Sequence, residues 1–119
     1  MAAKDELGRR GEDVAADYLE HHGLVVVSRN WRCAEGELDI VATDGDRTVV
    51  FCEVKTRSGT LFGTPVEQVT IGKRRRIRRL ASLWLTTSGT PWRYCRFDVI
   101  GVLVGADGVP VVQHVVEAF

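Results

Sequence analysis

The chain has 119 residues, which predicts a single domain over residues 1–119. Its 16 basic and 16 acidic residues balance to zero formal charge, so a role with nucleic acid must depend on where the charge lies. No apolar run approaches the roughly 20 residues that span a bilayer, and we expect no membrane association. Three widely spaced cysteines and the lack of a signal-peptide pattern favour reduced thiols and a cytoplasmic location.

Residues 4–22 predict an amphipathic helix that ends at Gly23. Glu12 lies on the small, apolar side of this helix, where Gly8 and Gly11 would let a sheet approach closely. Two interpretations of Glu12 stay open at this point. It is either a partly exposed helix glutamate or a member of a site formed with the strands that follow.

Residues 24–32 predict the first strand, and residues 36–56 predict a β-hairpin with apolar arms. One arm carries Glu37 and Asp39, and the other carries Glu53 and Lys55. Side chains two residues apart in a strand share one face, and burying charge there is unfavourable unless the groups are paired or bind something. We therefore expect a functional site on this hairpin.

The length of the hairpin loop decides whether the two arms contribute to one site. Asp39 and Glu53 share a face of the sheet only if the loop after Thr43 has an odd number of residues, because side chains alternate along each strand. A two-residue turn would put the two carboxylates on opposite faces. We predict a loop of three or five residues, and the choice between these registers stays open. Leu38 and Ile40 are expected together on the face opposite Asp39.

Residues 57–64 predict a Gly-rich loop that contains Phe62 and Gly63 and forms the lip of the site. Residues 64–67 resemble a helix-capping box, and a short turn follows. A second helix is then expected over residues 71–88, capped by Thr70. Its expected buried face has four members: Ile77, Leu80, Ala81 and Trp84.

A dense basic run at residues 73–79 lies in the first half of the second helix. Lys73 is expected at the edge of the buried face and pointing inward, whereas Arg75, Arg78 and Arg79 face water. A charge run is often only a solvated face. Arginine forms two-point contacts with phosphate, however, and its density here favours a nucleic-acid-binding surface.

Residues 94–104 and 109–116 predict the last two strands. Arg96 and Asp98 share a face of the first of these strands, where a salt bridge that anchors the sheet is favoured over a catalytic role. The histidines have no metal-ligand spacing and are expected at the surface: His21, His22 and His114.

The spacing of the charged residues resembles a known nuclease motif. Asp39 precedes Glu53-Val54-Lys55 by fourteen residues, with Glu12 upstream, and this pattern is similar to that of the PD-(D/E)XK nuclease superfamily. Leu38 stands where the superfamily's name has proline, a position that varies among its members. More closely, nearly the whole chain resembles the YraN family of endonuclease-like proteins, which is similar to archaeal Holliday-junction resolvases. The segments that carry this resemblance are residues 11–15, 30–32, 36–39, 51–57, Lys73 with Ala81 and Leu85, 96–98 and 117–119.

The resemblance implies an α/β, restriction-endonuclease-like fold, with a mixed central β-sheet of about five strands flanked by two main helices. It also implies a metal centre. The carboxylates of Asp39 and Glu53, with the carbonyl of Val54, offer hard oxygen ligands suited to Mg²⁺ or Mn²⁺, and Glu12 completes the set. Glu12, Asp39, Glu53 and Lys55 are the expected catalytic residues.

Lys55 lies between carboxylates in the sequence, and we expect them to favour its protonated form. In that form Lys55 would orient the attacking water and steady the scissile phosphate. Glu37 either supports the metal ligands or is only solvated, and both alternatives stay open. The expected nucleic-acid-binding residues are Arg57, Lys73, Arg75, Arg78 and Arg79.

These expectations favour a metal-dependent endonuclease that hydrolyses DNA phosphodiester bonds, including those of branched or damaged DNA. The alternative is a module or partner subunit that binds nucleic acid on a nuclease fold without cutting. A two-carboxylate glycosidase explains neither the lysine nor the arginine-rich helix. DNA is the expected partner. The resolvase-like resemblance also implies a homodimer, because two symmetric cuts need two sites.

Overall fold

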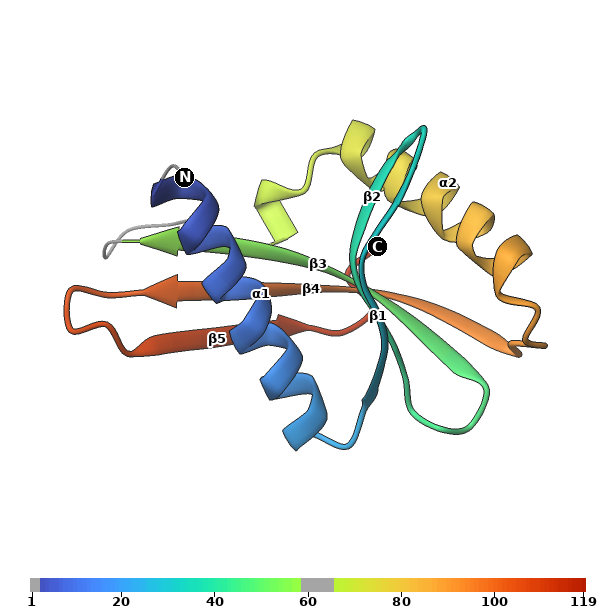
Figure 1. Ribbon diagram of the computed structural model, residues 1–119, viewed down its shortest axis with the longest axis horizontal. Helices are drawn as coiled ribbons and strands as arrows, with labels where there is room; N and C mark the ends of the chain where they lie inside the picture. Colours follow the sequence, from blue (N-terminus) through green and yellow to red (C-terminus); the bar gives the residue numbers. More distant parts are fainter. Residues whose placement is uncertain (1–2, 59–65) are drawn as a thin grey trace.

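Five apolar strands and two amphipathic helices build a mixed α/β fold, shown in the computed structural model of Figure 1. The structure describes residues 3–58 and 66–119. The elements are α1 (Ala3–His21), β1 (Val25–Cys33), β2 (Gly36–Thr43), β3 (Thr48–Ser58), the 3₁₀ turn η1 (Val66–Gln68), α2 (Ile71–Ser88), β4 (Tyr94–Val104) and β5 (Pro110–Val115). None of the helices in these two ranges has the length and apolar character to cross a bilayer.

The five strands form one sheet in the order β1-β2-β3-β4-β5. Three of the four pairings are antiparallel, whereas β3 and β4 are parallel along their whole length. A parallel pair needs a long crossover connection, and here α2 lies within it. The predicted mixed sheet of about five strands is confirmed, and the architecture is compatible with a restriction-endonuclease-like fold.

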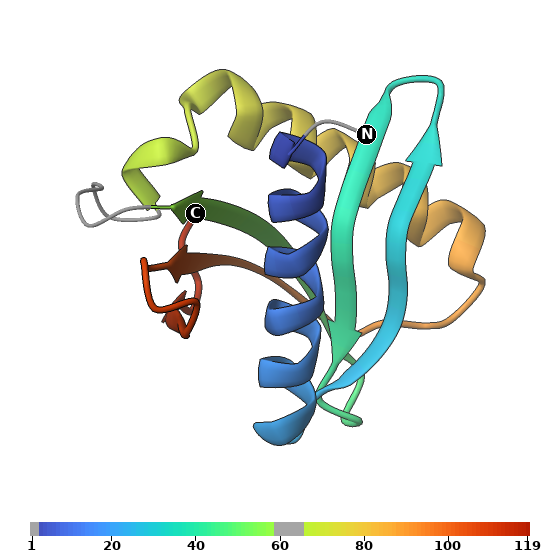
Figure 2. The same cartoon turned by 60° about the vertical axis from the view of Figure 1, so that its left-hand side comes forward.

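Each helix covers one face of the sheet and forms its own apolar core. On one face, Leu19 of α1 packs with a cluster that includes Ile40 and Ile100. On the other face, Trp84 of α2 packs with a cluster that includes Phe51. Figure 2 shows α1 lying against the sheet with α2 behind it. All four residues predicted for the buried face of α2 are buried: Ile77, Leu80, Ala81 and Trp84.

The loop between β2 and β3 has an odd number of residues, as predicted. Thr43 pairs with Val49, so the five residues 44–48 separate the closing pair, and the ladder ends where Ile40 pairs with Cys52. Continuing this register would set Asp39 opposite Glu53. The two carboxylates therefore belong to the same face of the sheet.

Leu38 departs from the expected alternation. It belongs to the α2-side core, whereas Ile40 belongs to the α1-side core. The pairing of β2 with β3 stops at Ile40, so residues 36–39 pair only with β1, which has a bulge between Val26 and Ser28. Two-stranded ribbons twist more than wide sheets do, and this twist turns Leu38 toward α2.

The connection from β3 to α2 differs in part from the prediction. Strand β3 continues through Arg57 to Ser58, because β4 supplies a parallel partner to its end. The expected lip residues Phe62 and Gly63 and the first half of the expected capping box lie outside the described residues. Helix α2 begins as predicted, since the Thr70 side chain accepts a hydrogen bond from the Lys73 amide.

Asp98 is buried within a network of hydrogen bonds that fixes the last two strands. Arg96 forms the predicted salt bridge through two nitrogens, at 2.9 and 3.0 Å. His114 Nε2 lies 2.7 Å from Oδ2 of the same carboxylate, so its predicted surface position was wrong. Pairing with Ile100 of β4 sets the His114 side chain on the covered face. Burial opposes ionisation of Asp98, but the hydrogen bonds from His114 and Arg96 outweigh it and lower the pKa.

Gly11 allows α1 to approach β3 closely, and this contact can be tested. A Cβ at position 11 would lie 2.7 Å from Thr56 Cβ, whereas a Cβ at Gly8 would meet nothing within 4 Å. We expect Gly11→Ala to lower the free energy of unfolding by about 1–3 kcal/mol through overpacking. Gly8→Ala should instead raise it by about 0.5–1 kcal/mol, because alanine loses less backbone entropy in a helix. Chemical denaturation measures both, and equal stability of the two variants would contradict the close contact.

Candidate active site and metal centre

One cavity, of about 450 Å³, brings together residues from α1, β2, β3 and α2. We call it the site cavity. Seven of the residues predicted for the site line it: Glu12, Asp39, Glu53, Val54, Lys55, Arg57 and Lys73. The remaining three predicted residues, Arg75, Arg78 and Arg79, do not line it. The sequence prediction thus divides into a group that meets in one place and an arginine group that lies elsewhere on α2.

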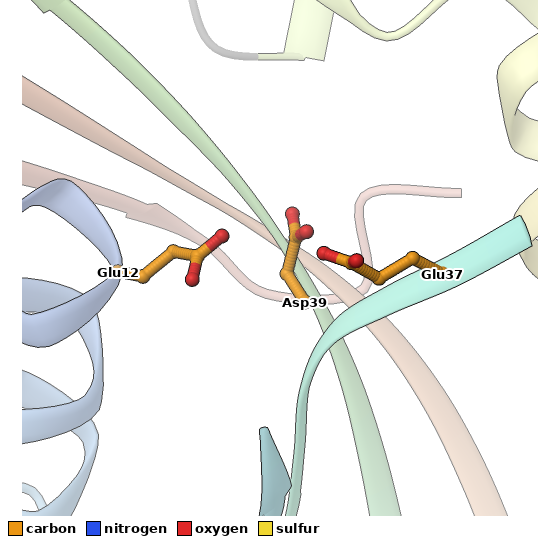
Figure 3. A group of neighbouring side chains, drawn as sticks. All are labelled: Glu12, Glu37 and Asp39. Carbon is orange, nitrogen blue, oxygen red and sulfur yellow. The ribbon is translucent and has the colours of Figure 1, made fainter. Parts of the chain in front are cut away.

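Three carboxylates converge beside the site cavity, and two of them, Glu12 and Asp39, line it. Glu12 projects from α1, and Glu37 and Asp39 project from β2 (Figure 3). One oxygen from each lies within 4.8 Å of the others. Glu37 also forms an ion pair with Arg32. Of the two alternatives for Glu37, this geometry favours a supporting position beside Asp39 over simple solvation.

Asp39 is held by the backbone of β3. The amide of Val54 donates a hydrogen bond to Asp39 Oδ2 at 2.9 Å. Burial, together with the negative charge of Glu53, raises the pKa of Asp39 to about 8. In a strand the amide and carbonyl of one residue point to the same edge, so the Val54 carbonyl points to the β2 side of β3, beyond the end of the β2–β3 ladder.

Glu53 is the most buried carboxylate of the site cavity, with 6% of its surface exposed. Its Oε1 lies 2.8 Å from Nζ of Lys73, which the first turn of α2 directs inward as predicted. Burial lowers the pKa of Lys73, but the hydrogen bond with Glu53 helps to outweigh it, so that the net shift is upward. An ammonium group thus neutralises Glu53 in this structure.

The pKa of Lys55 is lowered, whereas we expected its neighbours to favour the protonated form. Burial, followed by a hydrogen bond and repulsion from Lys73, lowers the pKa of Lys55 to about 8. Glu53 acts in the expected direction but more weakly. The carboxylates that favour the protonated form are near Lys55 in the sequence, whereas the second lysine, Lys73, is brought beside it by α2.

Asn30 is a site residue that the residue-by-residue reasoning missed. Burial raises the pKa of Glu12, and a hydrogen bond with the Asn30 side chain partly opposes this rise. Asn30 also has a left-handed backbone, with φ of 52° inside β1. Asparagine tolerates this conformation better than most residues, and strained backbone is common at functional sites. The residue type was a signal, although only the fold shows that Asn30 faces Glu12.

The three arginines outside the site cavity have different surroundings. Arg78 lies over the rings of Phe97 and Phe119, at 4.8 and 5.6 Å from their centroids. Arg79 forms an ion pair with Glu35 at 2.5 Å. Arg75 is exposed, as predicted. Of the predicted phosphate contacts, only Arg57 and Lys73 adjoin the carboxylates.

The donor set suits a hard divalent cation. Carboxylate oxygens from two elements converge without a sulfur or imidazole ligand among the residues that line the site cavity. Mg²⁺ and Mn²⁺ prefer such oxygen ligands. Burial, and after it repulsion from neighbouring carboxylates, raises the pKa values of Glu12 and Asp39, and a bound cation would offset both effects.

The raised pKa of Asp39 predicts a pH dependence of stability in metal-free buffer. The unfolded carboxyl loses its proton near its ordinary pKa of 3.8, whereas the folded one keeps it up to about 8. The folded state therefore holds more protons across this window, and the group lowers stability as the pH rises. We expect the melting temperature of the wild type to fall relative to that of Asp39→Asn over this range.

The exposed Asp17 on α1 provides the control for this titration. Asp17→Asn should keep the pH profile of the wild type when melting is followed in buffer containing a chelator. Parallel profiles for the wild type and Asp39→Asn would contradict the raised pKa.

Comparison with known proteins gives a consistent family assignment. The pattern described as "Uncharacterised protein family UPF0102" matches residues 11–102. A UPF0102 protein of Nocardia farcinica is 51% identical over 116 residues, which cover 98% of this chain and 91% of that protein. A relative in Rhodococcus jostii is 49% identical over 119 residues, the full length of both chains. Another in Mycolicibacterium smegmatis is 54% identical over 110 residues, or 92% of this chain and 89% of that protein. The chain therefore belongs to the UPF0102 family.

Proposed function

We propose that this protein is a metal-dependent nuclease that hydrolyses phosphodiester bonds in DNA. The observation that carries the proposal is the meeting of Asp39, Glu53 and Lys55 with Glu12 in one cavity. These residues come from three separate elements, and their order matches the resemblance to the PD-(D/E)XK superfamily. An acidic centre beside two lysines suits a substrate that is an anion and a reaction that develops further negative charge.

Asp39, Glu12 and Glu53 would hold the divalent cation, with the Val54 carbonyl as a further oxygen ligand and Glu37 in support. When bound, Mg²⁺ would lower the pKa of a water molecule and offset negative charge on the phosphate. Val54 keeps Asp39 oriented through its amide. Asn30 orients Glu12 in the same way through its side-chain hydrogen bond.

Lys55 positions the attacking water and steadies the phosphate. With a pKa of about 8, roughly a tenth of the Lys55 amine is neutral at pH 7, and this fraction can accept a proton from that water. The water oxygen then bonds to phosphorus while the bond to the leaving oxygen breaks, and the leaving oxygen takes a proton from solvent.

Lys73 and Arg57 bind phosphate oxygens next to the reacting group. Lys73 is paired with Glu53 at 2.8 Å, so engaging a phosphate or admitting a cation requires this ammonium group to move or to be shared. Arg75 and Arg79 extend the basic surface along α2, consistent with DNA as the partner. A homodimer acting on branched or damaged DNA stays a prediction.

A second candidate function is binding of nucleic acid without cutting. One observation favours it: the Lys73 ammonium group forms an ion pair with the buried Glu53 and so compensates the charge that a cation would otherwise offset. Conversely, a protein that only binds has no need of the Asp39, Glu53 and Lys55 arrangement, because the three groups are costly to bury together. A cleavage experiment separates the two functions.

The nuclease proposal predicts that the purified protein cuts labelled branched, linear or single-stranded DNA with Mg²⁺ or Mn²⁺. Asp39→Ala should reduce the rate by at least about a hundredfold, because it removes charge stabilisation at the metal centre. Lys55→Ala should also cut slowly while retaining metal binding. Gel analysis of the products measures both effects.

Asp17→Ala, on the exposed side of α1, is the matched control for loss of a carboxylate and should cut like the wild type. Binding that needs no metal, with no cleavage of any substrate, would favour the second function. Cleavage at the normal rate by Lys55→Ala would remove the role given to that lysine.

The Lys73–Glu53 ion pair predicts competition with the metal ion. Lys73→Met leaves Glu53 buried without a partner, so Mn²⁺ should bind about tenfold more tightly in a calorimetric titration. Lys55→Met also removes a nearby ammonium group but keeps the Glu53 ion pair, and we expect a smaller gain. Equal affinities for the wild type and Lys73→Met would show that Lys73 does not compete with the cation.

A further inference from the structure

A second cavity, of about 400 Å³, lies between α2 and the turn of the β1–β2 hairpin. Its lining consists of Glu35, Arg75, Arg76, Arg79 and Leu80, and it shares no residue with the site cavity. We call it the arginine cavity. Three guanidinium groups and one carboxylate give its lining a net positive charge. Arg76 was not among the residues predicted to bind nucleic acid, whereas Arg78, which was, does not line the arginine cavity.

Close packing of the hairpin turn on α2 builds the arginine cavity. Gly36 has φ of 143°, and a Cβ there would lie 3.3 Å from Leu80 Cδ1 and 3.8 Å from Arg76 Cδ. The missing side chain lets the turn approach the helix, where Figure 1 shows the tip of the hairpin beside α2. Glu35, directly before Gly36, is thereby held against the arginines.

The arginines of this cavity are not equally engaged. Arg79 makes a two-point contact with Glu35, from Nε to Oε1 at 2.5 Å and from Nη2 to Oε2 at 3.3 Å. Arg75 and Arg76 have no hydrogen-bond or ion-pair partner within the described parts of the chain. The carboxylate of Glu35 thus neutralises one of three guanidinium groups and leaves two available.

The contact between Glu35 and Arg79 has the geometry in which a guanidinium group binds two oxygens of a phosphate. The ion pair is accessible, since 43% of the Glu35 side chain and 65% of the Arg79 side chain are exposed. Exposed ion pairs are weak, so a phosphate that also contacts Arg75 and Arg76 can displace the carboxylate.

The arginine cavity is close to the site cavity along α2. Lys73 lines one and Arg76 lines the other, and residues three apart on a helix are neighbours on its surface. A nucleic-acid strand bound in the site cavity can therefore extend along α2 to the arginine cavity.

We propose that the arginine cavity binds a backbone phosphate of the nucleic acid and that Glu35 competes with this phosphate for Arg79. The inference rests on the proposed function and deepens it, because it names a second contact on the same strand and a residue that restrains binding. Glu35 acts as an internal substitute for the phosphate. It lowers the affinity of the arginine cavity for any nucleic acid that cannot also contact Arg75 and Arg76.

The test measures binding of fluorescein-labelled DNA by anisotropy in a chelator, where no cleavage is needed. Glu35→Gln should bind about threefold more tightly or better, and Arg76→Gln should bind more weakly, with a log-log salt slope reduced by about 0.9. Glu20→Gln and Arg93→Gln, which change exposed charges elsewhere, serve as matched controls and should bind like the wild type.

A double-mutant cycle separates competition for Arg79 from general repulsion. Glu35→Gln should gain affinity in the wild type but little in an Arg79→Gln background, since the contested guanidinium group is then absent. An equal gain in both backgrounds, or a gain no larger than that of Glu20→Gln, would overturn the inference. Unchanged binding by Arg76→Gln would overturn it too.

The same samples keep this inference distinct from the proposed function. If the wild type binds DNA and the substitutions in the arginine cavity do not change its affinity, the proposed phosphate site is wrong and the nuclease proposal stands. If the cavity variants behave as expected but the wild type cuts no DNA with Mg²⁺ or Mn²⁺, the phosphate site stands and the nuclease proposal is wrong. Absence of any DNA binding by the wild type overturns both.

Discussion

Burial of Glu53 beside Asp39 is the constraint on which the rest of the site depends. Two carboxylates in a poorly hydrated cavity repel each other and lose their solvation, which the upward shift of the Asp39 pKa reflects. The fold offsets this with the Val54 amide at Asp39 and the Lys73 ammonium group at Glu53. Both compensations require that β2, β3 and α2 keep their relative positions. The two apolar cores that fix this geometry are therefore part of the chemistry of the site.

Much of the fold could be predicted because it depends on local periodicity. The alternation of side chains along the strands predicted that the hairpin loop has an odd number of residues. The helical spacing of apolar residues predicted the buried face of α2. The errors have a different origin. Leu38 changes face because the β2–β3 ladder ends at Ile40, and His114 is drawn inward by pairing with β4. Neither the end of a ladder nor the partner of an edge strand can be read from neighbouring residues alone.

The candidate site shows the same division. Asp39, Glu53 and Lys55 lie on one hairpin, so their spacing was sufficient to place them together. Contacts between distant elements were missed. Lys73 lowers the pKa of Lys55 from another helix, and Asn30 reaches Glu12 from β1. A titratable group responds to every charge around it in space, and only a minority of these charges are close in sequence.

The Lys73–Glu53 ion pair also bears on how the chain reaches its native state. Many small metal-binding domains stay unstructured until the ion arrives, since their ligands repel one another without it. Here an ammonium group carried by the chain itself fills that electrostatic role. We therefore expect the chain to fold without a divalent ion, and the cation of the proposed metal centre would bind only after folding.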